Sequence, residues 1–372
     1  MYNLEKYFDI HSPGYVIEIY NNKKEYEYII GNSRIKPDIK KVQKNTLYDI
    51  ASLTKTFTAV LIYMAYEEKK IDINDRIFSI DNNFTNLKDV KVLDLLSHNQ
   101  NIWTKGYLGD VNSKEEFYNV LFSAYVKEKT PTYVDVHYII LSYLLEKIYG
   151  KSFDLICKEK IFNVLGLKDI TFHPEGLDCA SNNYETLNGE EIDYIFPGII
   201  HDTKARKAKE LGIYTGHASI FSTGRDLLLF LEGLLNYKLL KKETIEFMLS
   251  HKDVNKENYE YLKTITSEDE INNMYEKALK INKDLYLPFT YNNMGVRYKN
   301  DISVLNDVPY IASDNSVSFS GYTGPMFTID FKSNVIVVIM CNVMHNTKLK
   351  RGERKKITIE IMNDIFKNLH NC

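Results

Sequence analysis

Cysteine is scarce in this sequence, and its few residues are widely scattered. Cys157, Cys179, Cys341 and Cys372 form no C-x-x-C pair, so we expect reduced thiols. The nine histidines are equally dispersed, and no H-x-x-x-H face for zinc is present. A phosphate-cradling G-x-x-x-x-G-K-[ST] loop is also missing. We therefore expect neither a bound metal nor another cofactor.

An excess of one charge and a long hydrophobic run are also lacking. The 47 basic and 50 acidic residues leave a net charge of -3 without a basic stripe, so nucleic acid is not an expected partner. No apolar run approaches the roughly 18 residues that span a bilayer. Residues 1–7 show no basic run followed by an apolar core. The sequence as given predicts a cytoplasmic protein without a membrane segment, and it leaves open whether a leader has been trimmed.

What is present is the pattern of a globular protein with strands at both ends. With 372 residues, 44% of them hydrophobic, the chain is long enough for one large domain or two intertwined ones. A hairpin is predicted at residues 15–30, and further strands are predicted at 291–298, 317–320, 326–330 and 335–340. Helices are predicted at residues 92–98, 113–126, 139–149, 152–167, 227–235 and 354–369.

This order of elements predicts an α/β (α+β) fold, in which an antiparallel sheet is assembled from the two ends of the chain and flanked by helices. We assign residues 1–80 and 205–372 to this sheet domain and residues 81–204 to an inserted, mainly helical domain. A catalytic cleft is expected between the two. The polar stretch at 251–285 is interpreted as a surface excursion.

Ser52 and Lys55 place a hydroxyl and an amine about one helical turn apart, and therefore on the same face. The helix is predicted from apolar residues that recur at steps of three and four: Phe57, Val60, Leu61, Met64 and Ala65. Ser52 would lie at its N-terminus, where backbone N–H groups stabilise developing negative charge. Alone, this pattern is also typical of a capping serine followed by a solvated lysine.

Two further segments accompany this pair. Tyr133 and Asp135 stand just before the helix predicted at 139–149, on a loop that can point into a cleft, although Asp135 alternatively caps that helix. Residues 320–324 read SGYTG between two predicted strands. Taken with SLTK at 52–55, the segments YVD and SGYTG resemble, in order and approximate spacing, the three motifs of serine β-lactamases and penicillin-binding proteins.

The chain is most similar to the class C branch of that superfamily, which includes class C β-lactamases, D-alanyl-D-alanine carboxypeptidases, D-aminopeptidases and carboxylesterases. The short segments at residues 48–55, 95–98, 216–218 and 221–223 also resemble segments of the family. The resemblance runs from about residue 14 to residue 369. It implies a β-lactamase/transpeptidase-like fold. Residues 201–202 resemble a loop phrase of some members, where His201 either lines the cleft or is held by local hydrogen bonds.

The resemblance implies that Ser52 attacks a carbonyl and forms an acyl-enzyme. Lys55 or Tyr133 would serve as the base, and the sequence leaves both possibilities open. The resemblance also implies that backbone N–H groups of Ser52 and Tyr322 hold the oxyanion. The positions that it assigns to oxyanion and substrate binding are Asp135, Phe319, Ser320, Gly321 and Tyr322.

Two positions depart from the family pattern. Asp135 stands where Asn is usual, and its carboxylate is expected to raise the pKa of Lys55. Phe319 stands where Lys or His is usual, so the group that would meet a substrate carboxylate is missing. Esterases of the branch carry an aromatic residue there, which favours an uncharged ester or amide over the substrates of β-lactamases and carboxypeptidases.

The sequence thus predicts a serine hydrolase that acts through acyl-Ser52 on a small-molecule or peptide-like ester or amide. The alternative is a protein of the same fold that binds a ligand with weak or no turnover. The oligomeric state is not indicated.

Overall fold

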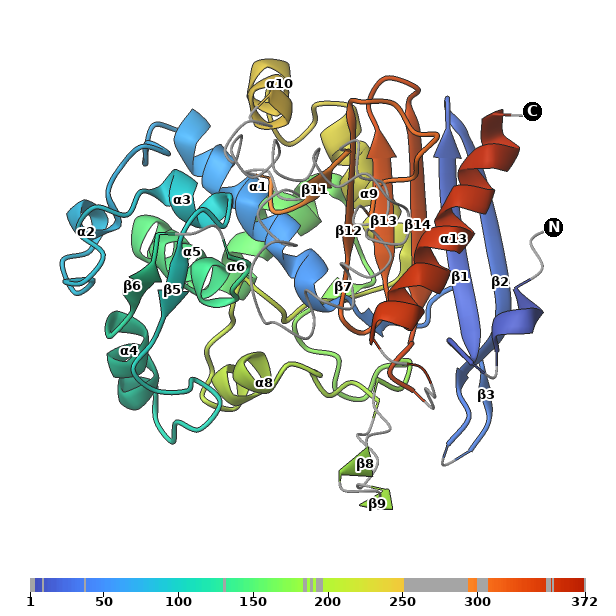
Figure 1. The fold of residues 1–372 in the computed structure, drawn as a ribbon, viewed down its shortest axis with the longest axis horizontal. Coiled ribbons are helices and arrows are strands. Elements are labelled where there is room, and N and C mark those ends of the chain that lie inside the picture. The colour runs from blue at the N-terminus through green and yellow to red at the C-terminus, as the bar shows by residue number, and fades with distance from the viewer. Residues whose placement is uncertain are drawn as a thin grey trace, which may run out of the picture.

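The computed structural model describes residues 4–8, 10–36, 38–129, 132–182, 186–187, 190–191, 197–250, 294–299, 307–345, 349 and 351–370. The surface excursion predicted at residues 251–285 lies outside the described residues. In the part of the chain that is described, an antiparallel sheet forms one side of the molecule and a group of helices forms the other (Figure 1).

The sheet combines the two ends of the chain. Its strands are β1 (Gly14–Asn21), β2 (Lys24–Arg34), β3 (Lys40–Lys41), β11 (Arg297–Tyr298), β12 (Ser316–Ser320), β13 (Met326–Asp330) and β14 (Val335–Cys341). Their order is β11-β12-β13-β14-β1-β2-β3, and each neighbouring pair is antiparallel. The N-terminal hairpin β1–β2 therefore joins the C-terminal strands along β14. This arrangement confirms the predicted fold class.

Helices cover both faces of the sheet, with α13 (Arg351–His370) in front of it and α9 (Gly224–Leu235) behind it in the view of Figure 1. Because both faces are covered, every residue of β14 is buried and its sequence is apolar throughout. Val335, Val337 and Ile339 lie in one cluster with residues of α13. Ile336, Val338 and Met340 lie in the cluster that contains α9, as the two-residue period of a strand requires.

The other side of the molecule is mainly helical. Its helices are α1 (Thr54–Glu67), α2 (Ile77–Ile80), α3 (Val92–Leu96), α4 (Lys114–Phe122), α5 (Val136–Tyr149), α6 (Phe153–Cys157), α7 (Asn163–Leu165), α8 (Thr203–Glu210) and α10 (Lys242–Ser250). Short 3₁₀ turns lie at Glu5–Tyr7 and Ala51–Leu53, and a π-helical turn at Lys158–Phe162 joins α6 to α7.

Short strands connect these helices. They are β4 (Tyr48–Asp49), β5 (Asn101–Trp103), β6 (Tyr125–Glu128), β7 (Ile170–Thr171), β8 (Thr186–Leu187), β9 (Glu190–Glu191) and β10 (Phe221–Ser222). Strands β4, β10 and β7 form a small sheet, whereas β5–β6 and β8–β9 are two-stranded. The small sheet brings β4, which leads into Ser52, beside the segment at 221–222.

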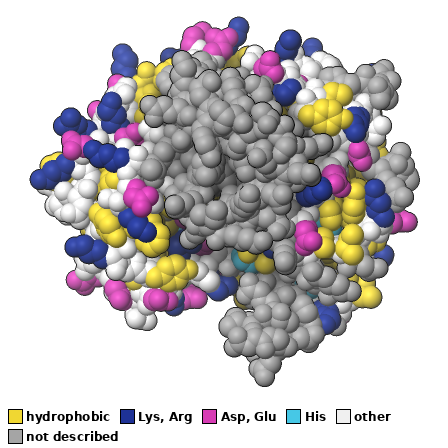
Figure 2. Space-filling view, viewed as in Figure 1, with side chains coloured by type: hydrophobic (Ala, Val, Ile, Leu, Met, Phe, Trp, Pro, Cys, Tyr) yellow, Lys and Arg dark blue, Asp and Glu magenta, His cyan; other side chains and the backbone are white. Residues whose placement is uncertain are grey.

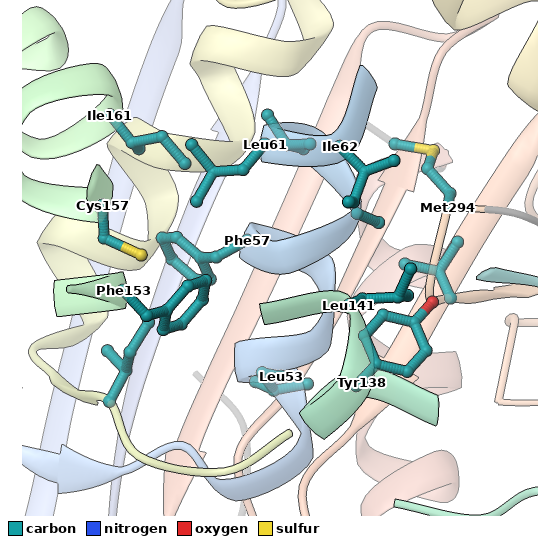
Figure 3. Close-up of a cluster of buried hydrophobic side chains, with 14 of the residues drawn as sticks. Leu53, Phe57, Leu61, Ile62, Tyr138, Leu141, Phe153, Cys157, Ile161 and Met294 are labelled. Atoms are coloured by element: carbon teal, nitrogen blue, oxygen red, sulfur yellow. The ribbon is translucent and has the colours of Figure 1, made fainter. Parts of the chain in front are cut away.

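Helix α1 runs through the centre of the hydrophobic core (Figure 3). The helix was predicted from one recurring set of apolar residues, but 11 of its 14 residues are buried. The reason is that α1 has neighbours on several sides: Phe57 stacks on Phe230 of α9, and Tyr138 and Leu141 of α5 belong to the same cluster. This cluster also includes residues of the sheet, so one continuous core joins the two parts of the chain. The domain boundaries at 80/81 and 204/205 stay a prediction.

Two predicted helices are shorter or less regular than expected. The helix predicted at 113–126 begins as predicted, because the Ser113 hydroxyl accepts the Glu116 N–H at 3.1 Å, but it ends at Phe122. Residues 125–128 instead form β6, whose backbone pairs with β5. The helix predicted at 152–167 is interrupted by the π-helical turn.

The surface of the described residues carries both signs of charge. Basic and acidic side chains alternate around the visible margin of the face in Figure 2. Among the described residues, no helix combines the length and the apolar character needed to cross a bilayer.

Candidate active site

The candidate nucleophile Ser52 lies in the 3₁₀ turn between β4 and α1. Ala51, directly before it, has φ of 46°, a left-handed conformation that is costly for a residue with a Cβ. The Asp49 carboxylate holds this conformation, because its Oδ1 accepts the Ala51 N–H at 2.8 Å. Its Oδ2 accepts the His201 N–H at 2.8 Å and the Asn182 amide at 3.1 Å. One buried carboxylate thereby ties the turn at Ser52 to the loop before α8.

The structure brings Ser52, Lys55 and Tyr133 together. Lys55 Nζ lies 3.1 Å from Ser52 Oγ, as expected for residues one turn apart. The Tyr133 hydroxyl donates to the same Oγ at 2.8 Å from the segment before α5. Ser52 and Tyr133 are half-buried, whereas Lys55 is fully buried. A single alcohol is thus in contact with one amine and one phenol.

The Lys55 amine is held in its charged form. It donates to three acceptors, which are Ser52 Oγ, Asp135 Oδ1 at 2.9 Å and the His217 carbonyl at 3.1 Å. Burial lowers the pKa of Lys55, but the Asp135 carboxylate, aided by the contact with the Tyr133 hydroxyl, outweighs burial, so its pKa lies above the usual value. This is the direction expected from a carboxylate at position 135. In the resting site Lys55 is an ammonium rather than a base.

Asp135 does not cap helix α5, although that alternative was favoured by its position in the sequence. It is the first residue before α5, but its side chain makes no capping hydrogen bond. Instead it lies between two ammonium groups, with Oδ1 on Lys55 at 2.9 Å and Oδ2 on Lys204 at 3.1 Å. Burial raises the pKa of Asp135, whereas Lys55, His217 and Lys204 hold it well below its usual range.

Lys204 and His217 are site residues that the sequence analysis missed. Lys204, on α8, also bonds Asp202 Oδ2 at 3.0 Å, and His217 Nε2 bonds Asp202 Oδ1 at 2.9 Å. No motif marks Lys204, which contacts Asp135 only through the packing of α8. Asp202 also caps α8 through the Ala205 N–H.

Two carboxylates and one imidazole near Lys204 also have the spacing of metal ligands. Ligand atoms of Asp135, Asp202 and His217 lie within 4.8 Å of one another. The ammonium of Lys204 is bonded to both carboxylates, so the chain itself supplies a cation between them.

The third motif lies directly against the nucleophile turn. A Cβ on Gly321 would come within 2.6 Å of the Ile50 carbonyl oxygen, so only glycine permits this approach. The Thr323 hydroxyl donates to the Asp49 carbonyl at 2.7 Å. Tyr322, between them, is 41% exposed, and its ring lies 5.2 Å from that of His201. His201 is therefore placed beside the third motif, with its backbone held by Asp49.

Ser320 and Phe319 have different surroundings. The Ser320 hydroxyl donates to Asp307 Oδ2 at 2.8 Å. Asp307 is fully buried between Arg297 and Lys355, whose charges outweigh burial and lower its pKa to about 2. Phe319 is 1% exposed and lies opposite Phe327 of β13, within the hydrophobic core. An apolar core residue thus occupies the position at which the resemblance implied a cation.

Two neutral histidines, His98 and His137, lie in sequence of contact behind the Tyr133 ring: His98 packs on Tyr133, and His137 bonds His98. The His98 ring lies 4.7 Å from the Tyr133 ring, and its Nδ1 is 2.8 Å from Nδ1 of His137. Burial lowers the pKa of His137 to about 3 and that of His98 well below its usual value. One Nδ1 therefore donates and the other accepts, and neither ring carries charge at neutral pH.

An antiparallel sheet with helices on both faces, beside a serine and a lysine one turn apart at the start of a central helix, is the arrangement of the β-lactamase fold. A family model described as Beta-lactamase matches residues 3–359. The chain belongs to that family.

Individual relatives are distant. A provisionally named D-alanyl-D-alanine carboxypeptidase from Salmonella enteritidis PT4 is 24% identical over 340 residues, which cover 81% of this chain and 70% of that protein. Among solved structures, FmtA from Staphylococcus aureus is 20% identical with a TM-score of 0.67, covering 97% of this chain and 86% of that one. EstCE1, a hydrolase with promiscuous acyltransferase activity, is 16% identical with a TM-score of 0.71, covering 96% of each chain. These structures share the fold.

Proposed function

We propose that this protein is a serine hydrolase that cleaves an ester or amide through an acyl-Ser52 intermediate. The observation that carries the proposal is the double contact at Ser52 Oγ, with the Tyr133 hydroxyl at 2.8 Å and Lys55 Nζ at 3.1 Å. A nucleophilic alcohol needs a neighbouring group that accepts its proton, and here two candidates touch it. Family membership supports the same chemistry.

The reactive form of the site has one proton fewer than the resting form. In the resting form Lys55 is an ammonium and Tyr133 donates to Ser52. After the Tyr133–Lys55 pair loses one proton, either an ionised Tyr133 or a neutral Lys55 can accept the proton of Ser52. Ser52 Oγ then attacks the carbonyl carbon, and the accepted proton passes to the leaving group. Water repeats the sequence to release the acyl group.

The third motif would complete the site. Its strand reaches the nucleophile turn at Gly321, so the backbone N–H of Tyr322 is proposed to bind the oxyanion together with that of Ser52. Because Phe319 is apolar and buried, position 319 offers no charge to a substrate carboxylate. We therefore propose an ester or amide without a carboxylate beside the bond that is cleaved.

Labelling with a fluorophosphonate, followed by peptide mass spectrometry, tests this proposal. A phosphonyl adduct is expected on Ser52, and Ser52→Ala should remove both the adduct and the hydrolysis of p-nitrophenyl esters. Nitrocefin should be turned over poorly or not at all. An unmodified Ser52 after treatment with fluorophosphonates and β-lactams would overturn the proposal.

A ligand-binding protein without turnover is the second candidate, because Asp135 stabilises Lys55 as an ammonium that accepts no proton. This candidate predicts that a ligand raises the melting temperature equally in wild type and Ser52→Ala. It also predicts no burst of product from an activated ester in the wild type.

A further inference from the structure

The Asp135 carboxylate is shared between two lysines on opposite sides of it. Its Oδ1 meets Lys55 at 2.9 Å and its Oδ2 meets Lys204 at 3.1 Å. Lys55 is fully buried, and the Lys204 side chain is only 18% exposed. The Asp135 side chain itself is 26% exposed, so both contacts are partly shielded from water, and charges interact more strongly there than at a fully exposed surface.

The contacts continue as a chain of alternating charge, Lys55–Asp135–Lys204–Asp202. Lys204 bonds Asp202 at 3.0 Å, and Asp202 in turn accepts a hydrogen bond from His217. Burial lowers the pKa of Lys204, but the two carboxylates outweigh burial and raise it, so its charge persists. Two carboxylates are thus balanced by two ammonium groups. Without Lys204, Lys55 would be the ammonium group left in contact with Asp135 among the described residues.

We propose that Lys204 is a positioning residue for the hydrolase. Because Lys204 shares the Asp135 carboxylate, that carboxylate stabilises the Lys55 ammonium less strongly, and the Tyr133–Lys55 pair can release a proton. This inference rests on the proposed function. In electrostatic terms, the Lys204 ammonium offsets part of the Asp135 charge that acts on Lys55, while it also pairs with Asp202.

The other groups that face Lys55 do not supply this balance. Tyr133 and Asp135 approach from the start of α5, and His217 approaches through its carbonyl oxygen. His98 and His137, which lie behind Tyr133, are kept neutral by burial. Among the described residues, the lysines that contact Asp135 are Lys55 and Lys204. The His217 imidazole is common to all variants compared below.

The test compares Lys204→Met, Asp135→Asn and the double variant, with Lys207→Met as the matched control. Lys207 lies on the same helix and pairs with Glu210 at 2.8 Å, so its loss changes the net charge equally without touching Asp135. The measurement is the rate of Ser52 phosphonylation as a function of pH. Lys204→Arg, which keeps the charge, shows whether the effect depends on charge or on packing.

We expect Lys204→Met to shift the acidic limb of the pH–rate profile to higher pH by about one unit or more, because a compensating charge within a few ångströms is lost. On that limb the rate at a fixed pH falls about tenfold per unit. Asp135→Asn should shift the limb to lower pH. In the double variant the limb should lie close to its wild-type position. Lys204→Arg and Lys207→Met should leave the limb in place.

A second readout does not depend on catalysis. In the Asp135→Asn background, where the pKa of Lys55 is expected to be lower, ¹³Cε-lysine NMR should show that Lys204→Met raises this pKa again. Equal Lys55 titration with and without Lys204, or a Lys204→Met profile identical to that of Lys207→Met, would overturn the inference and leave the hydrolase intact. If no variant is phosphonylated, the proposed hydrolase fails, and the NMR comparison still decides whether Lys204 tunes Lys55. If Lys204→Met does not fold, the Lys204→Arg and double-variant profiles decide.

Discussion

The Tyr133 hydroxyl lies 2.8 Å from Ser52 Oγ although 81 positions separate the two residues. Tyr133→Phe removes this contact and keeps the ring that packs against His98. Because the hydroxyl is proposed to take part in proton transfer, we expect Ser52 phosphonylation to slow by about 100- to 10,000-fold. The melting temperature should change little.

Tyr66→Phe is a suitable control, since Tyr66 is exposed on α1 away from Ser52. A Tyr133→Phe variant that is phosphonylated at the wild-type rate would show that the phenol takes no part in activating Ser52.

Gly321→Ala should separate the third motif from the nucleophile turn. The new Cβ would lie 2.6 Å from the Ile50 carbonyl oxygen, which is backbone and has little freedom to move. We expect both slower phosphonylation and a loss of about 1–3 kcal/mol in the free energy of unfolding, measured by urea denaturation.

The matched variant for this prediction is Gly106→Ala, whose Cβ would meet only methyl groups of Val120 at 3.2 Å or more. Equal effects of the two substitutions would contradict the close approach at Ile50.

Asp49→Asn should loosen the turn at Ser52 and the loop at His201 together. The Asp49 carboxylate accepts hydrogen bonds from Ala51, Asn182 and His201, whereas an amide would direct N–H groups at one or more of these donors. A buried donor without a partner costs about 1–3 kcal/mol, so we expect the free energy of unfolding to fall by that amount. Phosphonylation of Ser52 should slow as well.

The exposed Asp89, 4.0 Å from Arg76, provides the comparison, because Asp89→Asn should be neutral in both assays. Wild-type stability and reactivity of Asp49→Asn would show that the carboxylate is not needed to hold the strained Ala51.

Glu18 makes stability depend on pH. It is buried on β1 opposite Glu27 of β2, and burial together with the Glu27 carboxylate raises its pKa to about 8. The folded state therefore holds a proton that the unfolded state releases near pH 4.5, so this group lowers stability as pH rises from about 4.5 to 8. Glu18→Gln should remove that loss and raise the free energy of unfolding at pH 8 by about 1–3 kcal/mol.

Thermal or urea denaturation at pH 5 and pH 8 measures the difference. Glu115→Gln, at an exposed position of α4, serves as control. A stability difference between Glu18→Gln and wild type that is the same at both pH values would rule out a raised pKa at Glu18.

Contacts between near neighbours were determined by the sequence itself. A spacing of three residues was enough to place Lys55 beside Ser52, since one helical turn fixes their separation, and the contact is 3.1 Å. The helix start at Ser113 also followed from the sequence, because its cap is a hydrogen bond to a residue only three positions away. The apolar run of β14 predicted a strand, because a short apolar run bounded by turn residues is typical of a strand that is buried on both faces.

Only the tertiary structure decided which distant groups share the site. The place of Asp135 before a helix favoured a cap, but its side chain instead contacts Lys55 and Lys204, and Lys204 approaches from a helix 69 positions further along the chain. Phe319 was expected at the substrate, yet its side of β12 faces the core. Periodicity in the sequence describes one helix or strand at a time, whereas the places of Asp135 and Phe319 depend on how separate elements pack. A buried charge is costly without a partner, so packing brings unlike charges together.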